Sequence, residues 1–177
     1  PFHGAKAWEL MRRLNQMVLS GVLVEDSGTG SVSRTFFGIP EVRYAVTASD
    51  HRRFLRGVKL LAEMHFALGA EQVLLPFSGV PTVTRVDELA ALDDVRVPRE
   101  DLELFAVHLM GTARMGAEHK DSVVGSNGEL WDLPGCYVAD ASLFPTAIGR
   151  NPQITIMALA TMVAEKLADS LLSRQAA

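Results

Sequence analysis

The chain has 177 residues, of which 48% are hydrophobic, and its formal net charge at pH 7 is -4. This composition is sufficient to bury a sizeable core, either as one domain or as two small lobes. The slightly acidic charge argues against nucleic acid as a partner. The single cysteine, Cys136, excludes an internal disulfide and a zinc cluster of cysteines, so we expect no metal site. No run of about 18 apolar residues suggests a transmembrane segment, and no signal peptide is visible, which favours a cytoplasmic location.

Helices and strands alternate over the first part of the chain. Residues 5–20 carry apolar side chains at helical spacing, which predicts a helix with a core-facing stripe. Residues 22–24 and 32–37 are predicted to be the strands of a hairpin that turns at residues 27–30. Residues 41–47 alternate apolar and polar side chains, which predicts a strand with one exposed face. The core-facing residues expected in the first helix are Trp8, Met11, Leu14 and Val18.

A longer helix is predicted after Ser49 or Asp50, either of which suits its N-cap. His65 falls on the apolar stripe of this helix, so we interpret it as a hydrogen-bonded core histidine. A short strand is predicted at 73–75, and a short helix with a capping-box start from Thr84 to Leu92. The histidines expected to be exposed are His3, His51 and His119. The apolar stripe of the longer helix consists of Phe54, Val58, Leu61, His65 and Leu68.

The stretch from His108 to Gly116 follows an apolar, β-like run from Leu102 to Val107. It combines an imidazole, two glycines, a hydroxyl and a guanidinium in nine residues, a mixture that suits neither a strand interior nor a helix. It does suit a backbone that passes close to a ligand while presenting His108 to it. Taken alone, a single histidine at a strand end is more often a structural hydrogen-bonding residue than a catalyst.

A second cluster begins at the wholly apolar run Cys136–Ala139, which predicts a strand buried on both faces of a parallel sheet. The run ends at Asp140. Ligands gather at the carboxyl ends of such strands, so Asp140 is well placed for a ribityl or ribose hydroxyl. The alternative for Asp140 is a helix-cap or turn aspartate.

The longest predicted helix runs from Pro152 to Leu172 and is apolar around much of its circumference, which implies deep burial. Asn151 suits the N-cap of this helix and Pro152 its first position. Capping is not an exclusive role, because a residue at this turn also lies beside free backbone N–H groups and the positive end of the helix dipole.

Together these segments resemble the C-terminal part of the GMC (glucose-methanol-choline) flavoprotein oxidoreductases. The family pattern of a histidine followed by Gly-Thr and Arg-Met-Gly is matched by His108, Gly111, Thr112, Arg114, Met115 and Gly116. The later pattern of Asp-Ala-Ser, Phe-Pro and Asn-Pro is matched by Asp140–Ser142, Phe144, Pro145, Asn151 and Pro152. Ala113 departs from the family, in which many members carry cysteine here. The resemblance is specific over about 100–177; over 1–99 the layout resembles the cholesterol oxidase and long-chain-alcohol oxidase-like branch.

The resemblance implies an FAD-dependent enzyme that oxidises an alcohol by passing hydride from a CH–OH group to the flavin. It implies that His108 is the general base and that Asn151 positions the hydroxyl. Imidazole suits the first role because histidine exchanges its proton near working pH. The resemblance also implies that Asp140 and Ala141 approach the ribityl and pyrophosphate groups of FAD. The residues expected to face the flavin are Asn151, Pro152, Gln153 and Ile154, whose backbone N–H groups would stabilise developing negative charge.

The expected fold is α+β, with a mixed or antiparallel substrate-domain sheet and packed helices in residues 1–107. Residues 108–177 would supply the C-terminal strand and helix of a Rossmann-like FAD-binding domain. No G-x-G-x-x-G opens a βαβ unit, so we expect an N-terminal FAD-binding part to be missing and the isolated chain to be inactive and nearly free of flavin. The expected partners are this missing part and a small-molecule alcohol. Self-association of the isolated chain is also expected, through an unpaired strand at Cys136–Ala139.

Two functions of other classes remain open at this point. A non-catalytic module would pack on a partner and complete a larger protein without taking part in chemistry. A serine hydrolase would use His108, Asp140 and Ser142, but the chain contains no G-x-S-x-G nucleophile elbow.

Overall fold

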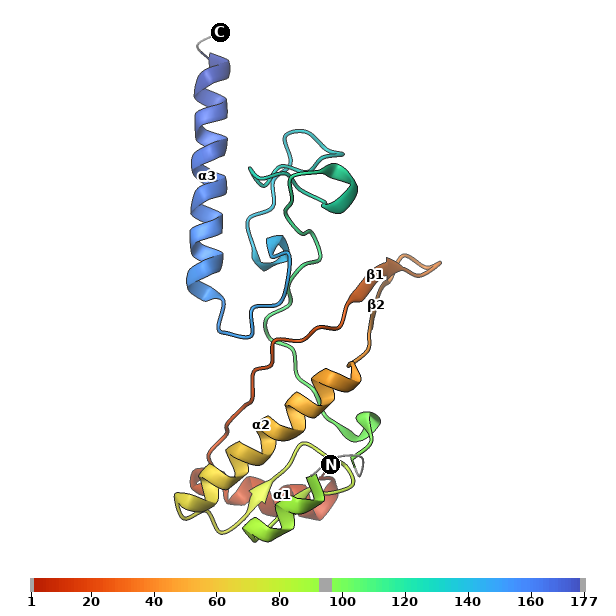
Figure 1. Ribbon diagram of the computed structural model, residues 1–177, viewed down its shortest axis with the longest axis vertical. Helices are drawn as coiled ribbons and strands as arrows, with labels where there is room; N and C mark the ends of the chain where they lie inside the picture. The colour runs from red at the N-terminus through yellow and green to blue at the C-terminus, as the bar shows by residue number, and fades with distance from the viewer. Residues whose placement is uncertain (1, 93–96, 176–177) are drawn as a thin grey trace. The chain divides into compact units, whose positions relative to one another are not determined.

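The computed structural model describes residues 2–92 and 97–175 (Figure 1). The chain divides into two compact units. The first unit comprises Pro1–Val24 and Val46–Phe105, and the second comprises Glu25–Ala45 and Ala106–Ala177. Helices and small antiparallel sheets make up both units, as expected for an α+β chain. The domain boundary expected between residues 107 and 108 stays a prediction.

The first unit is organised around the helix α2 (Ala48–Ala67). Thr47 caps this helix, since its Oγ1 accepts a hydrogen bond of 3.1 Å from the backbone N–H of Asp50. The Asp50 carboxylate in turn accepts a hydrogen bond of 2.7 Å from Thr47 Oγ1 and lies in the first turn, where the helix dipole favours negative charge. The predicted cap was therefore two or three residues too late, and Gly69, at φ +90°, ends the helix as its sequence indicates.

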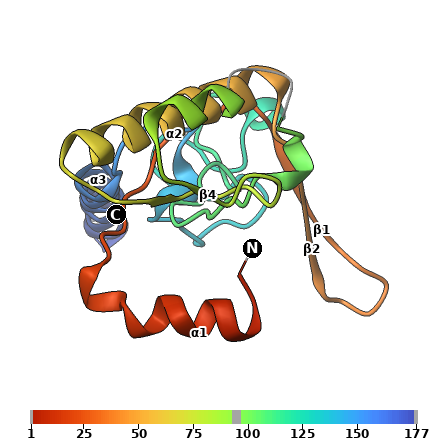
Figure 2. The ribbon, with the colours of Figure 1, turned by 90° about the horizontal axis from the view of Figure 1, so that it is seen from below.

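The core of the first unit lies between α2 and the chain that follows it. The short strands β3 (Val73–Leu74) and β4 (Thr82–Val83) pair antiparallel, and the 3-10 helix η2 (Val86–Leu92) packs on α2 (Figure 2). The backbone N–H of Thr84 donates to a carboxylate oxygen of Glu88 at 2.8 Å, so the predicted capping-box-like start is present in one of its two hydrogen bonds, and the helix is of the 3-10 type. The buried apolar residues are Leu55, Ala62, Leu75, Phe77, Val83, Leu89, Leu92 and Val97.

Two predictions about the first unit are wrong. The helix α1 (Gly4–Arg12) and the 3-10 turn η1 (Leu14–Gln16) bury no residue, and Trp8 is 69% exposed. The apolar stripe of α1 is present, but no described segment covers it. His51 was expected to be exposed and is only 8% exposed, because it lies on the inner side of the first turn of α2. His65 was expected to be a hydrogen-bonded core histidine; its Nε2 does lie 2.9 Å from Ser20 Oγ, but the residue is only half-buried and lies outside the core.

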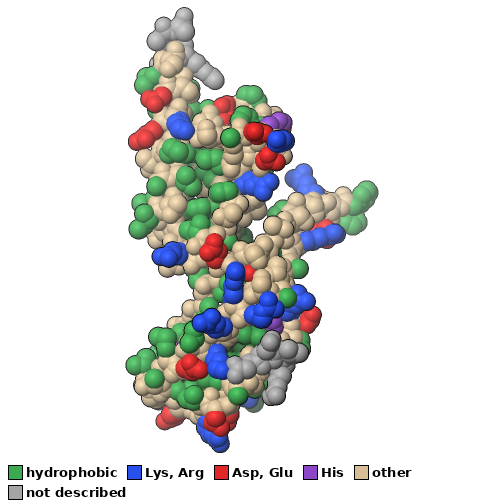
Figure 3. Space-filling view, in the orientation of Figure 1, with side chains coloured by type: hydrophobic (Ala, Val, Ile, Leu, Met, Phe, Trp, Pro, Cys, Tyr) green, Lys and Arg blue, Asp and Glu red, His purple; other side chains and the backbone are tan. Residues whose placement is uncertain are grey.

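In the second unit, β1 (Gly30–Arg34) and β2 (Pro40–Tyr44) form an antiparallel hairpin. The predicted strand at 41–47 is thus present, but the predicted turn at 27–30 is wrong. The chain turns at Thr35–Ile39 instead, where the Thr35 N–H donates to the Ile39 carbonyl at 2.9 Å and Gly38 has φ +77°. Hydrophobic side chains stand exposed at the tip of this hairpin (Figure 3).

The rest of the second unit is irregular backbone and one long helix, α3 (Gln153–Gln175). Its buried core residues are Val124, Leu143 and Val163. Half-buried side chains pack around them, and these are Met115, Leu130, Tyr137, Val138, Leu159 and Met162. Two short 3-10 helices, η4 (His119–Asp121) and η5 (Ala141–Leu143), interrupt the irregular segments. No helix within the described ranges is long and apolar enough to cross a membrane.

Candidate functional site

The second unit brings the two sequence clusters together. The Ala113 N–H donates to the Ser142 carbonyl at 3.1 Å, and the Met115 N–H donates to the Leu143 carbonyl at 2.9 Å. Gly111 crosses the same segment at φ +78°, where a Cβ would lie 3.3 Å from the Phe144 carbonyl oxygen. The positive φ and the close approach both favour glycine. Segments far apart in the sequence are therefore joined by backbone hydrogen bonds.

A frame of hydrogen bonds fixes the C-terminal side of the motif. The Arg114 Nε donates to the Asp121 carbonyl at 2.7 Å. Trp131 Nε1 donates to the buried Ser122 Oγ at 2.9 Å, and that hydroxyl donates to the Glu118 carbonyl at 2.7 Å. A Cβ on Gly116 would lie 2.7 Å from the Ser122 Cβ, so the loop closes tightly there. The role of Ser122 has no signal in the sequence, because its partners are spread over an irregular loop.

His108 lies on a bend in the N-terminal side of the motif and is exposed. The strand predicted from Leu102 to Val107 is wrong. Leu102 forms a β-bridge to Phe77 and the Glu103 N–H donates to the Pro76 carbonyl at 2.8 Å, but residues 104–107 belong to no strand. Phe105 is consequently 89% exposed. The apolar β-like pattern is present in the sequence without the neighbouring strand that would bury it.

Asp140 is an exposed turn residue in this structure. Its carboxylate accepts hydrogen bonds from the backbone N–H of Ser142 at 2.8 Å and from Ser142 Oγ, and it caps η5. The side-chain hydrogen bond from Ser142, followed by the backbone one, lowers the pKa of Asp140 below its ordinary value. The turn role considered for this aspartate is thus present. Ala141, the next predicted cofactor residue, is half-buried in η5.

The run Cys136–Ala139 that precedes Asp140 is not a buried parallel strand, so that prediction is wrong. Its backbone pairs antiparallel with residues 128–130, through Leu130 N–H to the Cys136 carbonyl and Val138 N–H to the Gly128 carbonyl, both 2.9 Å. Cys136 and Val138 are half-buried, because no described segment covers their second face. One edge of this run is therefore paired, and self-association through the run stays a prediction.

The helix α3 begins one residue later than predicted. The Ile156 N–H donates to the Pro152 carbonyl at 2.8 Å, so Pro152 rather than Asn151 accepts the first helical hydrogen bond. Pro152 is fully buried, whereas Asn151 is exposed and its side chain makes no hydrogen bond to any described residue. The N–H groups of Gln153 and Ile154 precede the first helical bond and have no acceptor within the helix. These groups lie at the start of α3 together with Asn151.

The deep burial predicted for α3 is absent in this chain. Val163 is buried, but Ile154 is 83% exposed and Met157 is 61% exposed. Hydrophobic side chains are visible on the surface along α3 (Figure 3). The helix is apolar on more sides than the described residues cover.

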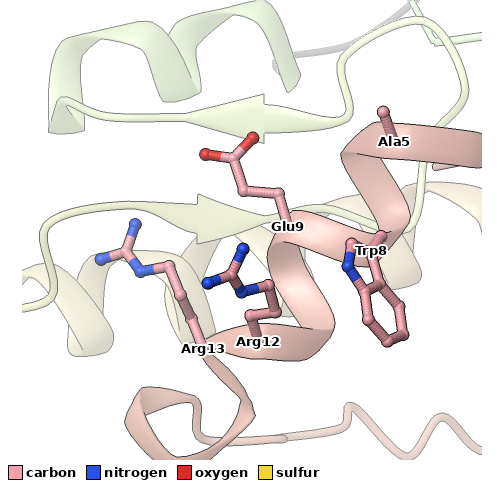
Figure 4. A pocket seen from close by; sticks show the side chains of 5 residues that line it. All are labelled: Ala5, Trp8, Glu9, Arg12 and Arg13. Carbon is pink, nitrogen blue, oxygen red and sulfur yellow. The ribbon is translucent and has the colours of Figure 1, made fainter.

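A hollow elsewhere in the molecule contains none of the predicted site residues. It lies in the first unit and is lined by Ala5, Trp8, Glu9, Arg12 and Arg13 (Figure 4). Arg13 is already engaged, since its Nε donates to Gln16 at 3.3 Å and its guanidinium lies 3.8 Å from the Glu71 carboxylate. Among the described residues, no group of three or more His, Cys, Asp or Glu side chains could hold a metal ion.

Comparison with known proteins decides the family. The sequence profile of the GMC oxidoreductases matches residues 29–160, a range that includes His108, Asp140 and Asn151. The chain belongs to the GMC oxidoreductase family. This GMC chain is 34% identical over 166 residues to an uncharacterised GMC-type oxidoreductase of Mycobacterium tuberculosis, covering 94% of this chain and 26% of that protein.

Two further proteins are similar to the chain, one in sequence and one in fold. It is 30% identical over 165 residues to a long-chain-alcohol oxidase of Arabidopsis thaliana, covering 86% of this chain and 21% of that oxidase. Its fold is similar to that of pyridoxine 4-oxidase from Mesorbium loti, with a TM-score of 0.52 at 21% identity, covering 80% of this chain and 28% of the other. The GMC chain thus spans about a quarter of the length of the curated relatives that it matches.

Proposed function

We propose that this chain is the C-terminal part of an FAD-dependent oxidoreductase that oxidises the CH–OH group of an alcohol. The observation that carries the proposal is the family match over residues 29–160, which includes both His108 and Asn151. The similar proteins support the reaction class, since they include long-chain-alcohol oxidases and a C-glycoside 3-oxidase. Residues 1–107 would contribute mainly to the substrate-binding domain, and residues 108–177 to the Rossmann-like FAD-binding and catalytic region.

The chemical groups at the start of α3 fit the flavin end of FAD. The N–H groups of Gln153 and Ile154 have no helical acceptor and lie at the positive end of a 23-residue helix, where an electron-rich carbonyl region would be stabilised. Asp140 offers a carboxylate with a lowered pKa to a ribityl hydroxyl, beside Ala141. Pro152 keeps this turn rigid. No glycine-rich strand-to-helix turn for a pyrophosphate occurs in the sequence, so an N-terminal part of the polypeptide would hold that group.

His108 would accept the hydroxyl proton of the substrate, while Asn151 would hold the same hydroxyl oxygen. Both side chains are exposed in this chain, and the amide of Asn151 has its hydrogen-bonding groups available to a ligand. FAD, when bound, supplies the acceptor for the hydrogen that leaves the substrate carbon as hydride. In this scheme the imidazole of His108 would accept the proton, and the cofactor would accept the hydride.

A reduction experiment on the full-length, flavin-loaded protein tests this proposal. The protein would be mixed anaerobically with a series of primary and secondary alcohols, including long-chain ones, and bleaching of the flavin would be followed. We expect at least one alcohol to bleach the flavin, with a rate that saturates as its concentration rises. A flavoprotein that no alcohol reduces, but that an amine or a thiol does, would contradict the reaction class.

A non-catalytic role is the second candidate, and the exposed apolar face of α3 favours it for the isolated chain. A helix with Ile154 and Met157 exposed is suited to packing on another part of a protein. We propose that the isolated chain purifies with little or no FAD and tends to self-associate through this face. Stoichiometric flavin in the isolated chain would show that its cofactor site is more self-contained than proposed.

A further inference from the structure

The loop that leads into α3 is crossed by another segment at Gly149. This glycine has φ +57°, a left-handed conformation that L side chains rarely adopt. A Cβ placed on Gly149 would lie 2.6 Å from the Cβ of Glu25, 3.0 Å from its backbone nitrogen and 3.1 Å from its Cα. These are backbone atoms and the first side-chain atom, which cannot swing away as the end of a flexible side chain can. Glycine is therefore required at this crossing for two independent reasons.

The crossing lies two residues before Asn151. On the other side of Asn151, Pro152 is fully buried and its carbonyl accepts the first hydrogen bond of α3. Asn151 thus lies between two fixed points, the crossing at Gly149 and the buried proline. Its own side chain is exposed and makes no hydrogen bond to a described residue. The backbone on either side therefore fixes the point from which the Asn151 side chain projects, and a bound hydroxyl would fix its amide.

We propose that Gly149 is a positioning residue for Asn151, and that its contact with the Glu25 backbone holds the Asn151 amide where it binds the substrate hydroxyl. This inference rests on the proposed function. A Cβ at residue 149 would push the loop away from residue 25 and move Asn151 with it. A misplacement of about 1 Å at a catalytic group can slow a reaction by about 10²-fold without any change in the group itself.

A double-mutant cycle on the full-length, flavin-loaded enzyme tests this coupling. Gly149→Ala and Asn151→Ala would be measured singly and together, by the rate of flavin reduction at saturating alcohol. We expect Gly149→Ala to slow reduction by about 10- to 100-fold, with a smaller change in KM. In the Asn151→Ala background the same substitution should change the rate less than about twofold, because the group that it misplaces is already absent.

Gly135→Ala is the matched control. Gly135 also has a left-handed backbone, at φ +84°, but a Cβ there would meet nothing within 4 Å. This variant also carries a left-handed penalty, but without a crossing, so we expect its flavin reduction to stay within about twofold of the wild-type rate. A loss of rate equal to that of Gly149→Ala would show that left-handed strain alone lowers activity, and would overturn the proposal.

Substitutions at Glu25 test the crossing itself. Glu25→Gly removes the Cβ that the methyl group introduced by Gly149→Ala would strike, whereas Glu25→Ala keeps that Cβ and removes only the carboxylate. We expect Glu25→Gly, but not Glu25→Ala, to raise the rate of the Gly149→Ala variant by at least about threefold. If Gly149→Ala alone fails to retain flavin, its pair with Glu25→Gly replaces it in the cycle.

The outcomes separate the two proposals. Multiplicative losses from Gly149→Ala and Asn151→Ala, or equal recovery from both Glu25 variants, would overturn the positioning role and leave the proposed function intact. A wild-type rate in Asn151→Ala would instead contradict the role of Asn151 in the proposed function, and the positioning role would fall with it.

Discussion

The motif loop and the helix α3 are fixed in opposite ways. The loop from His108 to Gly116 has no regular secondary structure, yet backbone hydrogen bonds join it to Ser142 and Leu143. The helix α3 has regular internal hydrogen bonding, but much of its apolar surface is uncovered. Regular structure is therefore not a measure of how firmly a segment is placed. In this chain, irregular backbone is placed by specific polar contacts, and a long helix is placed by one buried side.

The largest expected effect comes from His108, the first residue of the motif loop. We expect His108→Ala to slow flavin reduction in the full-length enzyme by about 10²–10⁴-fold, because a proton acceptor is lost from the chemical step. Substrate binding should change less. His119→Ala is the control, since His119 is an exposed histidine that lies 3.0 Å from Asp132 and outside the proposed site. Stopped-flow reduction of both variants gives the comparison, and equal rates would remove His108 from the mechanism.

The two sides of α3 should differ in what they contribute to stability. Val163→Ala should lower the free energy of unfolding of the chain by about 2–3 kcal/mol, because Val163 is buried against Val124 and Leu143. Met157→Ala removes more atoms, but from the exposed side of α3, and should change the free energy of unfolding by less than about 0.5 kcal/mol. Urea unfolding of the chain measures both. A larger loss at Met157 would mean that the exposed side is covered in solution.

The hydrogen bonds of Ser122 beside the motif should contribute somewhat less to the free energy of unfolding than the burial of Val163 does. Ser122→Ala removes the acceptor of Trp131 Nε1 and the donor to the Glu118 carbonyl, and we expect a loss of about 1–2 kcal/mol. Ser33→Ala is the control, because Ser33 Oγ bonds Glu41 at 3.3 Å on the exposed hairpin and should contribute very little. Urea unfolding again provides the measurement. If Ser122→Ala lowers the free energy of unfolding no more than Ser33→Ala does, the hydrogen bonds of Ser122 do not stabilise the loop.

The smallest expected effect is a pH dependence at Asp140. The pKa of this carboxyl is lowered from 3.8, so its interaction with Ser142 adds stability above that value and loses it as pH falls through the lowered pKa. Ser142→Ala should therefore destabilise the chain at about pH 6, by less than about 1 kcal/mol because Asp140 is exposed. The difference from wild type should shrink on going to about pH 3. Unfolding curves at both pH values test this, and a difference that grows in acid would contradict the assignment.

The sequence predicted helices better than it predicted what covers them. Both long helices and the capping interaction of Thr84 and Glu88 follow from local patterns, and all are present. The burial of Trp8 and of α3 was predicted from apolar patterns alone and is wrong, because an apolar pattern identifies a face of a helix without supplying the segment that would cover it. The hairpin turn was placed at residues 27–30 because glycine was taken as a turn residue there. Gly30 serves a close approach to the Arg43 carbonyl, where a Cβ would lie 2.7 Å away, and not a turn.

For the candidate site, the sequence identified two motifs but not the contacts that connect them. The two motifs were recognisable by their residue types, and their family is now shown. That Ala113 and Met115 bond to Ser142 and Leu143, or that Glu25 crosses Gly149, depends on contacts between segments far apart in sequence. The N-cap was misassigned by one residue, because proline and asparagine both suit the start of a helix.

The most direct test of the account is the Asn151→Asp variant of the full-length, flavin-loaded enzyme. Asn151 makes no capping hydrogen bond to a described residue, so the thermal midpoint should stay within about 2 °C of wild type. A carboxylate at this position would place negative charge where charge develops during reduction, and flavin reduction by alcohol should slow by about 10²-fold. An unchanged midpoint with a strongly lowered rate is the predicted result. A wild-type rate of flavin reduction would contradict the central claim that His108 and Asn151 together bind the substrate hydroxyl.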